Sequence, residues 1–323
     1  MLGIMREHTD GFVLLRGAFP RDAAAACRAA ISDRLRQDGI AFDDPSTWVE
    51  RHSIPELYGR ELGPPWSLVY TPRLAAALDQ LLGAGAWRDF GLGWWFFTFP
   101  GVSAPPWGAA GHWHVDGAHL NRTPASPEGA LILIVMLSDV AERGGGTALA
   151  VGSHRKAARL LWAHGGEGGL RGPRLSRLAL AELMDEEGAL RCPVVETRGK
   201  AGDVMLLHPL LLHARSKNLA PSVRVMCNPA VSLRAPMALR PGSPHAMSPV
   251  ERVIWQAQCA PAAAAACAAA DDDELRPGRK RARGAGRGGT SEDQSGDDDD
   301  GEAAAVAARM GFASFGARRQ RGR

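Results

Sequence analysis

The residues with the clearest chemical potential lie in a short run, Gly111–Gly117, which reads GHWHVDG. His114 and Asp116 are separated by one residue, and on a β-strand this spacing places both side chains on the same face. One imidazole nitrogen and one carboxylate oxygen can then bind the same metal ion. The spacing alone is common by chance, and the competing interpretation is a structural histidine followed by an Asx turn before the glycine.

A third ligand has to come from a distant part of the chain. His213 follows an apolar run of three leucines and lies 97 residues after Asp116. Two histidines and one carboxylate on one side of a metal ion form the arrangement of non-haem Fe(II) oxygenases, which leaves three positions open. His112 competes with His114 as the first ligand, but the residue two positions after His112 is a histidine and not a carboxylate.

Several longer segments accompany these residues in a fixed order. Residues 144–155 read GGGTALAVGSHR, residues 202–218 read GDVMLLHPLLLHARSKN, and Arg224 follows His213 by 11 residues. Together with HVD and the opening DGFVLLRGAFPRD, they resemble the phytanoyl-CoA dioxygenase (PhyH) family of Fe(II)- and 2-oxoglutarate-dependent oxygenases. The resemblance extends over residues 10–233, which is most of the chain.

This resemblance implies a role for each matching residue. His114, Asp116 and His213 match the iron ligands, and Arg224 matches the arginine that binds the distal carboxylate of 2-oxoglutarate. A guanidinium suits that role because it forms bidentate, charge-assisted bonds to carboxylates. The implied reaction uses O2 to hydroxylate a small organic substrate and releases succinate and CO2. An aspartate at position 116 favours hydroxylation over halogenation, since only a small residue there leaves room for chloride. Asn218 matches an asparagine that caps the turn after the distal histidine.

The sequence departs from the family pattern just after His213. The family often has Gly and then Ser at the next two positions, where this chain has Ala214 and Arg215. The serine contact to the oxoacid is therefore missing at that position. Ser216 comes one residue later and faces the opposite way on a regular strand. Arg215 either points to solvent or contacts an anionic substrate, and the sequence leaves both interpretations open.

Two other functions stay open beside the enzyme. A non-catalytic jelly-roll binding protein would keep the scaffold without turnover, and iron-dependent formation of succinate distinguishes it from an oxygenase. An oxygenase acting on protein or nucleic acid would be recruited by the basic segments Arg279–Arg283 and Ala317–Arg323, and deletion of residues 261–323 tests that. The balance of 38 Lys and Arg against 35 Asp and Glu, a net charge of +3, argues against a nucleic-acid binder.

The elements that must position these residues are mostly short strands. The sequence predicts helices at residues 21–37, 73–82, 176–187 and 247–258. It predicts strands at 10–17, 91–99, 111–115, 130–137, 147–151, 194–197, 203–207, 210–213 and 223–233. This pattern predicts a mainly β fold with flanking helices, a double-stranded β-helix (jelly roll, cupin-like). Substrate-selecting loops are expected around 44–70, 102–110, 118–128 and 156–175.

We expect one oxygenase domain over residues 1–260, with an N-terminal helical part (1–90) and a jelly-roll core (91–235). Residues 261–323 contain alternating blocks of acidic and basic residues, and this composition predicts a disordered low-complexity tail. Five scattered cysteines without a CxxC pair argue against a disulfide scaffold or zinc knuckle. The sequence lacks a membrane-length apolar run and a signal peptide, so it predicts a cytoplasmic protein. The alternative prediction is a nuclear protein, with residues 279–283 as the import signal.

Overall fold

The computed structural model describes residues 9–258, apart from residues 50, 51, 55, 57, 111 and 240–246. The predicted tail (261–323) and its basic segments lie outside the described residues, so the expectations about them stay predictions. Within the described part of the chain, no helix is both long and apolar enough to cross a membrane. The three cysteines in this part, Cys27, Cys192 and Cys227, are free thiols.

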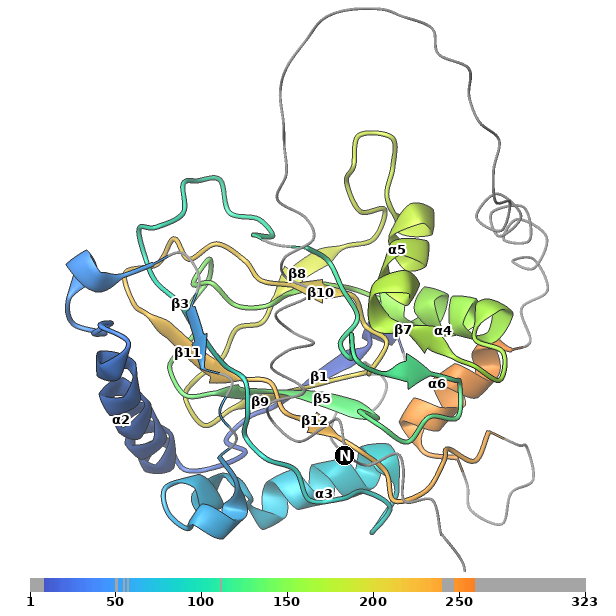
Figure 1. The fold of residues 1–323 in the computed structure, drawn as a ribbon, viewed down its shortest axis with the longest axis horizontal. Coiled ribbons are helices and arrows are strands. Elements are labelled where there is room, and N and C mark those ends of the chain that lie inside the picture. Colours follow the sequence, from blue (N-terminus) through green and yellow to red (C-terminus); the bar gives the residue numbers. More distant parts are fainter. Residues whose placement is uncertain are drawn as a thin grey trace, which may run out of the picture. The chain divides into compact units, whose positions relative to one another are not determined.

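Twelve short strands form the β-structure of the described residues (Figure 1). The large sheet has the order β1-β9-β5-β11-β3-β2, with β12 also pairing with β5. A smaller sheet has the order β10-β6-β8, and β4 pairs with β7. The bounds are β1 (Phe12–Leu15), β2 (His52–Ile54), β3 (Trp95–Thr98), β4 (Asn121–Arg122), β5 (Leu131–Met136), β6 (Ala148–Ala150), β7 (Leu170–Arg171), β8 (Val194–Glu196), β9 (Val204–Leu207), β10 (His213–Ala214), β11 (Arg224–Cys227) and β12 (Ala230–Val231).

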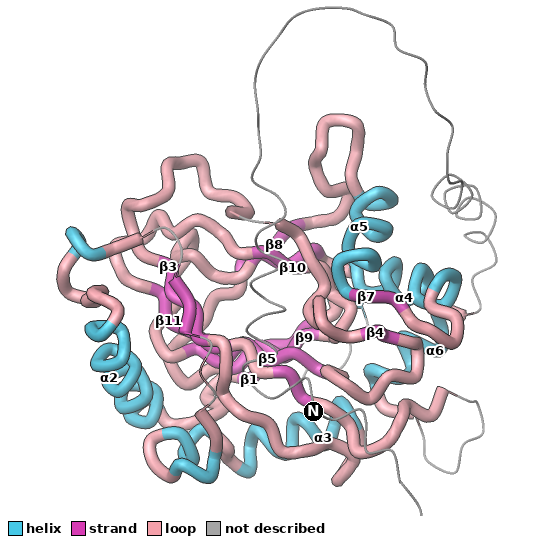
Figure 2. The backbone as a smooth tube through the Cα atoms, in the orientation of Figure 1, coloured by secondary structure: helices cyan, strands magenta, loops and turns pink. Residues whose placement is uncertain are grey.

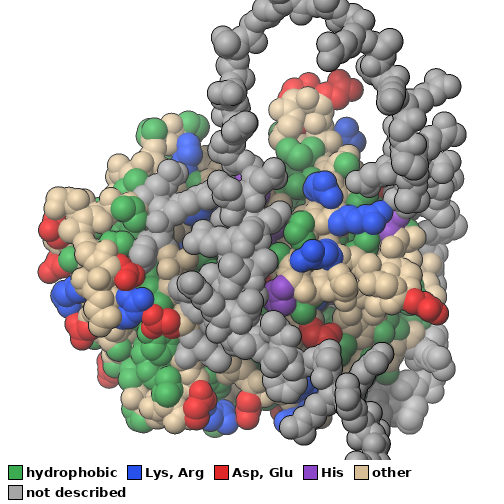
Figure 3. All heavy atoms as spheres, in the orientation of Figure 1, with side chains coloured by type: hydrophobic (Ala, Val, Ile, Leu, Met, Phe, Trp, Pro, Cys, Tyr) green, Lys and Arg blue, Asp and Glu red, His purple; other side chains and the backbone are tan. Residues whose placement is uncertain are grey.

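In the described part of the chain, five α-helices flank the sheets: α2 (Arg21–Gln37), α3 (Pro72–Leu82), α4 (Ser153–His164), α5 (Gly172–Leu183) and α6 (Pro249–Ala257). Short 3-10 helices lie at Pro45–Thr47, Arg60–Leu62 and Trp66–Val69. Figure 2 shows α3 below the large sheet and α4, α5 and α6 gathered at one end of it. Figure 3 shows Lys and Arg side chains on the face where α5 lies, and Arg174 and Arg177 of this helix are exposed.

The main core lies between the two sheets. The inner face of the large sheet is lined by alternate residues of neighbouring strands, because side chains of a strand point to its two faces in turn. Ile134 of β5 pairs with Met205 of β9, and Met136 pairs with Met226 of β11. These side chains are buried in one cluster with Leu149 of the small sheet. The two sheets do not close into a barrel, and this open jelly roll confirms the predicted fold class.

Several predicted elements agree with the structure, and the agreement has a physical basis. The helix at 21–37 has the predicted bounds. The helix at 73–82 starts one residue earlier, where Thr71 caps the backbone N–H of Leu74 (3.1 Å). The run LILIVM of β5 is buried at every position, which is typical of a strand covered on both faces. The N-terminal part also supplies β1 and β2 to the large sheet.

Several predictions about local structure are wrong. The helix predicted at 176–187 is α5, which begins at Gly172 and ends at Leu183. The strand predicted at 210–213 begins only at His213, in β10, and the one predicted at 223–233 is divided into β11 and β12. The strand predicted at 111–115 is not formed by residues 112–115, where His114 makes a single isolated bridge, and residue 111 lies outside the described residues. The strand predicted from residue 91 begins at Trp95, because Trp94 adopts a φ of 58° that breaks the extended chain. The expected loop at 156–175 contains most of α4, whose buried Ala157, Leu160 and Leu161 follow helical spacing.

Candidate metal centre

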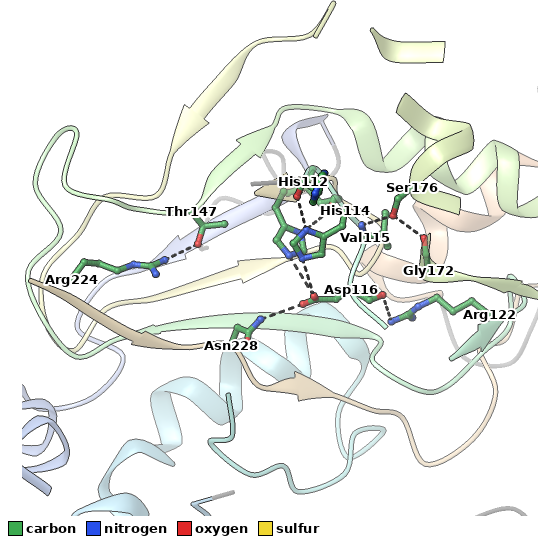
Figure 4. Close-up of polar contacts among 12 residues, drawn as sticks. His112, His114, Val115, Asp116, Arg122, Thr147, Gly172, Ser176, Arg224 and Asn228 are labelled. Carbon is green, nitrogen blue, oxygen red and sulfur yellow. Dashed lines mark hydrogen bonds and ion pairs between the residues drawn. The ribbon is translucent and has the colours of Figure 1, made fainter. Parts of the chain in front are cut away.

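The structure brings His114, Asp116 and His213 together (Figure 4). The backbone N–H of each histidine donates to the carbonyl of the other, both at 2.9 Å, and this pair of bonds fixes the two imidazoles side by side. The Oδ1 atom of Asp116 lies 3.5 Å from Nε2 of His114 and 3.6 Å from Nε2 of His213. One ligand atom from each residue therefore faces a common point, and all of them lie within 4.8 Å of one another.

Main-chain carbonyls orient both imidazoles for metal binding. Nδ1 of His114 lies 3.0 Å from the carbonyl oxygen of His112, and Nδ1 of His213 lies 2.9 Å from that of Leu211. A carbonyl oxygen only accepts hydrogen bonds, so each Nδ1 carries the proton and donates. Each Nε2 then directs its lone pair toward Asp116, which is the arrangement that a metal-binding histidine needs.

The electrostatics of the centre favour a charged carboxylate. Burial by itself raises the pKa of Asp116, but the positive charge that His213 and His114 carry when they are protonated, before a metal binds, lowers this pKa well below its ordinary value. The exposed side-chain fraction is 9% for His213, 23% for Asp116 and 45% for His114, so the centre opens to solvent on the side of His114. Two neutral imidazoles and one carboxylate form a donor set that fits a divalent transition metal.

Helix α5 holds the residue between the two ligands of the HVD motif. The backbone N–H of Val115 donates to Oγ of Ser176 at 2.9 Å, and this hydroxyl donates to the carbonyl of Gly172 at 2.7 Å. Ser176 is buried in the first turns of α5. No sequence motif points to Ser176, because it lies 61 positions from its partner. Asn228, whose Nδ2 lies 3.5 Å from Oδ2 of Asp116, was missed for the same reason.

Arg224 lies buried beside this centre. It is 2% exposed, and its guanidinium donates to the hydroxyls of Thr147 (2.8 Å) and Thr98 (3.5 Å). Burial lowers the pKa of Arg224 to about 9, with nearby Arg215 adding to the shift and Glu196 opposing it. Among the residues that the structure describes, no carboxylate lies within ion-pair distance of Arg224. A buried cation held by neutral hydroxyls keeps its capacity to bind an anion.

The sheet register relates Arg224 to the triad. His213 of β10 pairs with Leu149 of β6, and Thr147, which binds the guanidinium, lies two residues before Leu149. Because a strand rises by about 3.3 Å per residue, the guanidinium partner lies roughly 7 Å along the sheet from the level of His213. This separation is of the order that a short dicarboxylic acid can span between a metal ion and an arginine.

The residues after His213 follow the alternation of a strand. Ser216 is buried, and its hydroxyl donates to the carbonyl of Gly146 at 2.5 Å, on the opposite face from His213. Arg215 shares the face of His213 and donates to the carbonyl of Ala110 at 3.1 Å. Arg215 therefore lies beside the segment that leads into the HVD motif, and its electrostatic effect reaches Arg224.

Asn218 has the capping role that its position predicts. It is fully buried, its Nδ2 donates to the carbonyls of Thr98 and Ser222 (both 2.8 Å), and its Oδ1 accepts from the backbone of Ala220 (3.1 Å). We expect Asn218→Ala to reduce the free energy of unfolding by about 2–4 kcal/mol, since three hydrogen bonds are lost and buried carbonyls stay unsatisfied.

Urea unfolding of the metal-free protein measures this loss. The matched control is Asn121→Ala, which removes an exposed asparagine of β4 and should leave the midpoint within error of the wild-type value. Equal midpoints for both variants would contradict the capping role.

One family of known proteins matches most of this chain. The sequence profile described as phytanoyl-CoA dioxygenase (PhyH) matches residues 8–226. No protein with a curated description matches the chain.

Among solved structures, the chain is similar to EvdMO1, with a TM-score of 0.46 and 21% identity over 72% of this chain and 49% of that one. The chain thus spans about half the length of EvdMO1. It is also similar to SnoK, a non-heme alpha ketoglutarate dependent carbocyclase from nogalamycin biosynthesis (TM-score 0.44, 20% identity, 71% of this chain and 82% of that one). A third is HygX from Streptomyces hygroscopicus, with nickel and 2-oxoglutarate bound (TM-score 0.42, 17% identity, 70% of this chain and 84% of that one).

The profile match includes the HVD motif, His213 and Arg224, and it extends over more than half of the 323 residues. The chain belongs to the phytanoyl-CoA dioxygenase (PhyH) family.

Proposed function

We propose that this protein is an Fe(II)- and 2-oxoglutarate-dependent dioxygenase that hydroxylates a small organic substrate and releases succinate and CO2. The observation that carries the proposal is the convergence of three metal-binding side chains, His114, Asp116 and His213, next to a buried arginine that has no carboxylate partner among the described residues. Family membership supports the same activity.

Each residue of the centre has a distinct task in this reaction. His114 and His213 would bind Fe(II) through Nε2 and Asp116 through a carboxylate oxygen, while the carbonyls behind both imidazoles keep them oriented. Bound iron supplies the oxidative chemistry at the positions that the three side chains leave open. Arg224 would bind the distal carboxylate of 2-oxoglutarate, with the Thr147 hydroxyl holding the guanidinium in place.

The candidate metal centre has an apolar interior on one side and opens to solvent on the other. The cluster that includes Ile134, Met205 and Met226 fills the space between the sheets with apolar side chains. His114 is the most exposed of the three ligands, so the substrate would approach from its side. A dry interior strengthens the interaction of Arg224 with a carboxylate, because charges interact more strongly at low dielectric.

An anaerobic titration tests the proposal. The wild-type protein is expected to bind Fe(II) at one site, and 2-oxoglutarate added next should bind with a change in the visible absorption that reports chelation of the iron. Admission of O2 should then form succinate, even slowly and without the organic substrate. Failure to bind both components would overturn the proposal, whereas tight binding of both without any succinate would indicate a non-catalytic binding protein.

A further inference from the structure

A second buried arginine, Arg122, lies behind the metal centre. It is 3% exposed, and its Nη1 donates to the carbonyls of Glu128 (2.9 Å) and Gly129 (3.2 Å). Its Nη2 donates to the main-chain carbonyl of Asp116 at 3.3 Å. Figure 4 shows the contact of the guanidinium with Asp116. The guanidinium therefore links the backbone of the carboxylate ligand to the segment that leads into β5.

Two glycines make the space for this guanidinium. A Cβ atom at Gly117, directly after the ligand, would lie 2.9 Å from Nη2 and 3.2 Å from Nε of Arg122. A Cβ atom at Gly129 would lie 2.8 Å from Nη2. Both glycines also have a positive φ, 95° and 54°, which residues with a side chain adopt only under strain. A side chain at either position would displace the guanidinium from the ligand segment.

Among the described residues, no carboxylate lies within ion-pair distance of the Arg122 guanidinium. Its hydrogen bonds go to neutral carbonyls. Burial of such a cation is costly unless the surroundings offset it. The Nε atom is buried and has no hydrogen-bond acceptor in the part of the chain that the structure describes. This costly arrangement indicates a role beyond folding.

The other side of the ligand segment is held by α5. A Cβ atom at Gly172, the first residue of this helix, would lie 3.1 Å from the backbone of Gly117 and of Ala118. Arg122 itself lies on β4, which pairs with β7 immediately before α5. The backbone that follows Asp116 is thus packed between a helix start and a guanidinium.

We propose that Arg122 is a positioning residue that holds the main chain of Asp116 and thereby directs its carboxylate toward the two imidazoles. Arg122 does not touch the metal or the substrate. The inference rests on the proposed metal site. Arg122 would orient a metal ligand, whereas Arg224 would bind the cosubstrate.

Co(II) is the probe for the test, because it reports both affinity, by calorimetry, and ligand geometry, by its absorption spectrum. Arg122→Met should weaken Co(II) binding about 10- to 100-fold, as expected for a residue that orients a metal ligand. Its Co(II) spectrum should differ from that of the wild-type protein, while circular dichroism confirms the fold. Arg122→Lys, which keeps a donor and the charge, should restore part of the affinity.

The matched control is Arg234→Met. Arg234 also donates to a main-chain carbonyl, that of Gly85 (3.2 Å), but it is exposed and its acceptor does not belong to the ligand segment. This variant should bind Co(II) as the wild-type protein does. A merely structural Arg122 would lower the melting temperature of the metal-free protein and leave the affinity and spectrum of the folded protein unchanged, which would overturn the inference.

A double-mutant cycle with Gly129→Ala tests the inference if Arg122→Met folds poorly. Gly129→Ala alone should weaken Co(II) binding, because its methyl group pushes the guanidinium away. In the Arg122→Lys background the same methyl group should cost less, since the group that it displaces is smaller. An equal cost in both backgrounds would overturn the inference, whereas a wild-type protein that binds no Co(II) would overturn the proposed metal site instead.

Discussion

His114→Ala is expected to weaken Fe(II) binding by more than about 100-fold, beyond the loss typical of residues that only orient a ligand, and to abolish succinate formation. The imidazole supplies one of three donors to the centre, and its Nε2 lies 3.5 Å from the carboxylate of Asp116. With two donors left, the ion loses both affinity and defined geometry. Anaerobic calorimetry with Fe(II) and an assay of 2-oxoglutarate turnover measure the two effects.

His112→Ala is the matched control for this experiment. It removes an exposed imidazole two residues away but keeps the main-chain carbonyl that orients His114. Its Fe(II) affinity and turnover should equal those of the wild-type protein. If the two variants lose affinity equally, or if His112→Ala alone does, the assignment of His114 as the ligand is wrong.

Arg224→Met is expected to separate cosubstrate binding from metal binding. Loss of one partner of a buried charged pair costs about 2–5 kcal/mol, so the affinity for 2-oxoglutarate should fall by roughly 30-fold to several thousandfold. Fe(II) binding should be unchanged, because the guanidinium contacts Thr147 and Thr98 and not the triad. Calorimetry of 2-oxoglutarate binding to the Fe(II)-loaded protein under anaerobic conditions measures the difference.

Arg224→Met is also expected to stabilise the metal-free protein, although it weakens the binding of 2-oxoglutarate. In the metal-free protein the buried guanidinium has no carboxylate partner among the described residues, so replacing it with an apolar side chain of similar length should raise the melting temperature. The control is Arg198→Met, which removes an exposed arginine 3.3 Å from Glu142 and should change neither stability nor cosubstrate affinity by much. A 2-oxoglutarate affinity for Arg224→Met equal to that of the wild-type protein would contradict its role.

The sequence was sufficient to predict the fold class and three residues that the structure brings together, His114, Asp116 and His213, while the role of Arg224 stays a prediction. His114 and Asp116 are two residues apart, and His213 and Arg224 occur in a longer motif, so local spacing carries the information. The predicted strand at 111–115 was nevertheless wrong. The two ligands are aligned by one bridge to His213 and by Ser176, and neither contact follows from the order of residues near the motif.

The residues that support the ligands could not be predicted from the sequence, for a different reason. Arg122 and Ser176 act on the backbone of the HVD motif and not on any side chain with a recognisable pattern. An arginine that binds carbonyls looks in sequence like any exposed arginine. The one local signal was Gly117 with Gly129, whose positive φ angles and close contact with Arg122 become informative only in three dimensions.

The single bridge between His114 and His213 joins two parts of the chain that lie 99 positions apart, and a metal ion bound to both imidazoles would act as a reversible cross-link at that point. Closing a loop of this size removes chain entropy from the unfolded state, as a disulfide does. Resistance to unfolding would then track the supply of free metal, rising by about 1.4 kcal/mol for each tenfold excess over the dissociation constant. Removal of a bound metal ion would thus lower the stability of the fold at the point where these two parts of the chain meet.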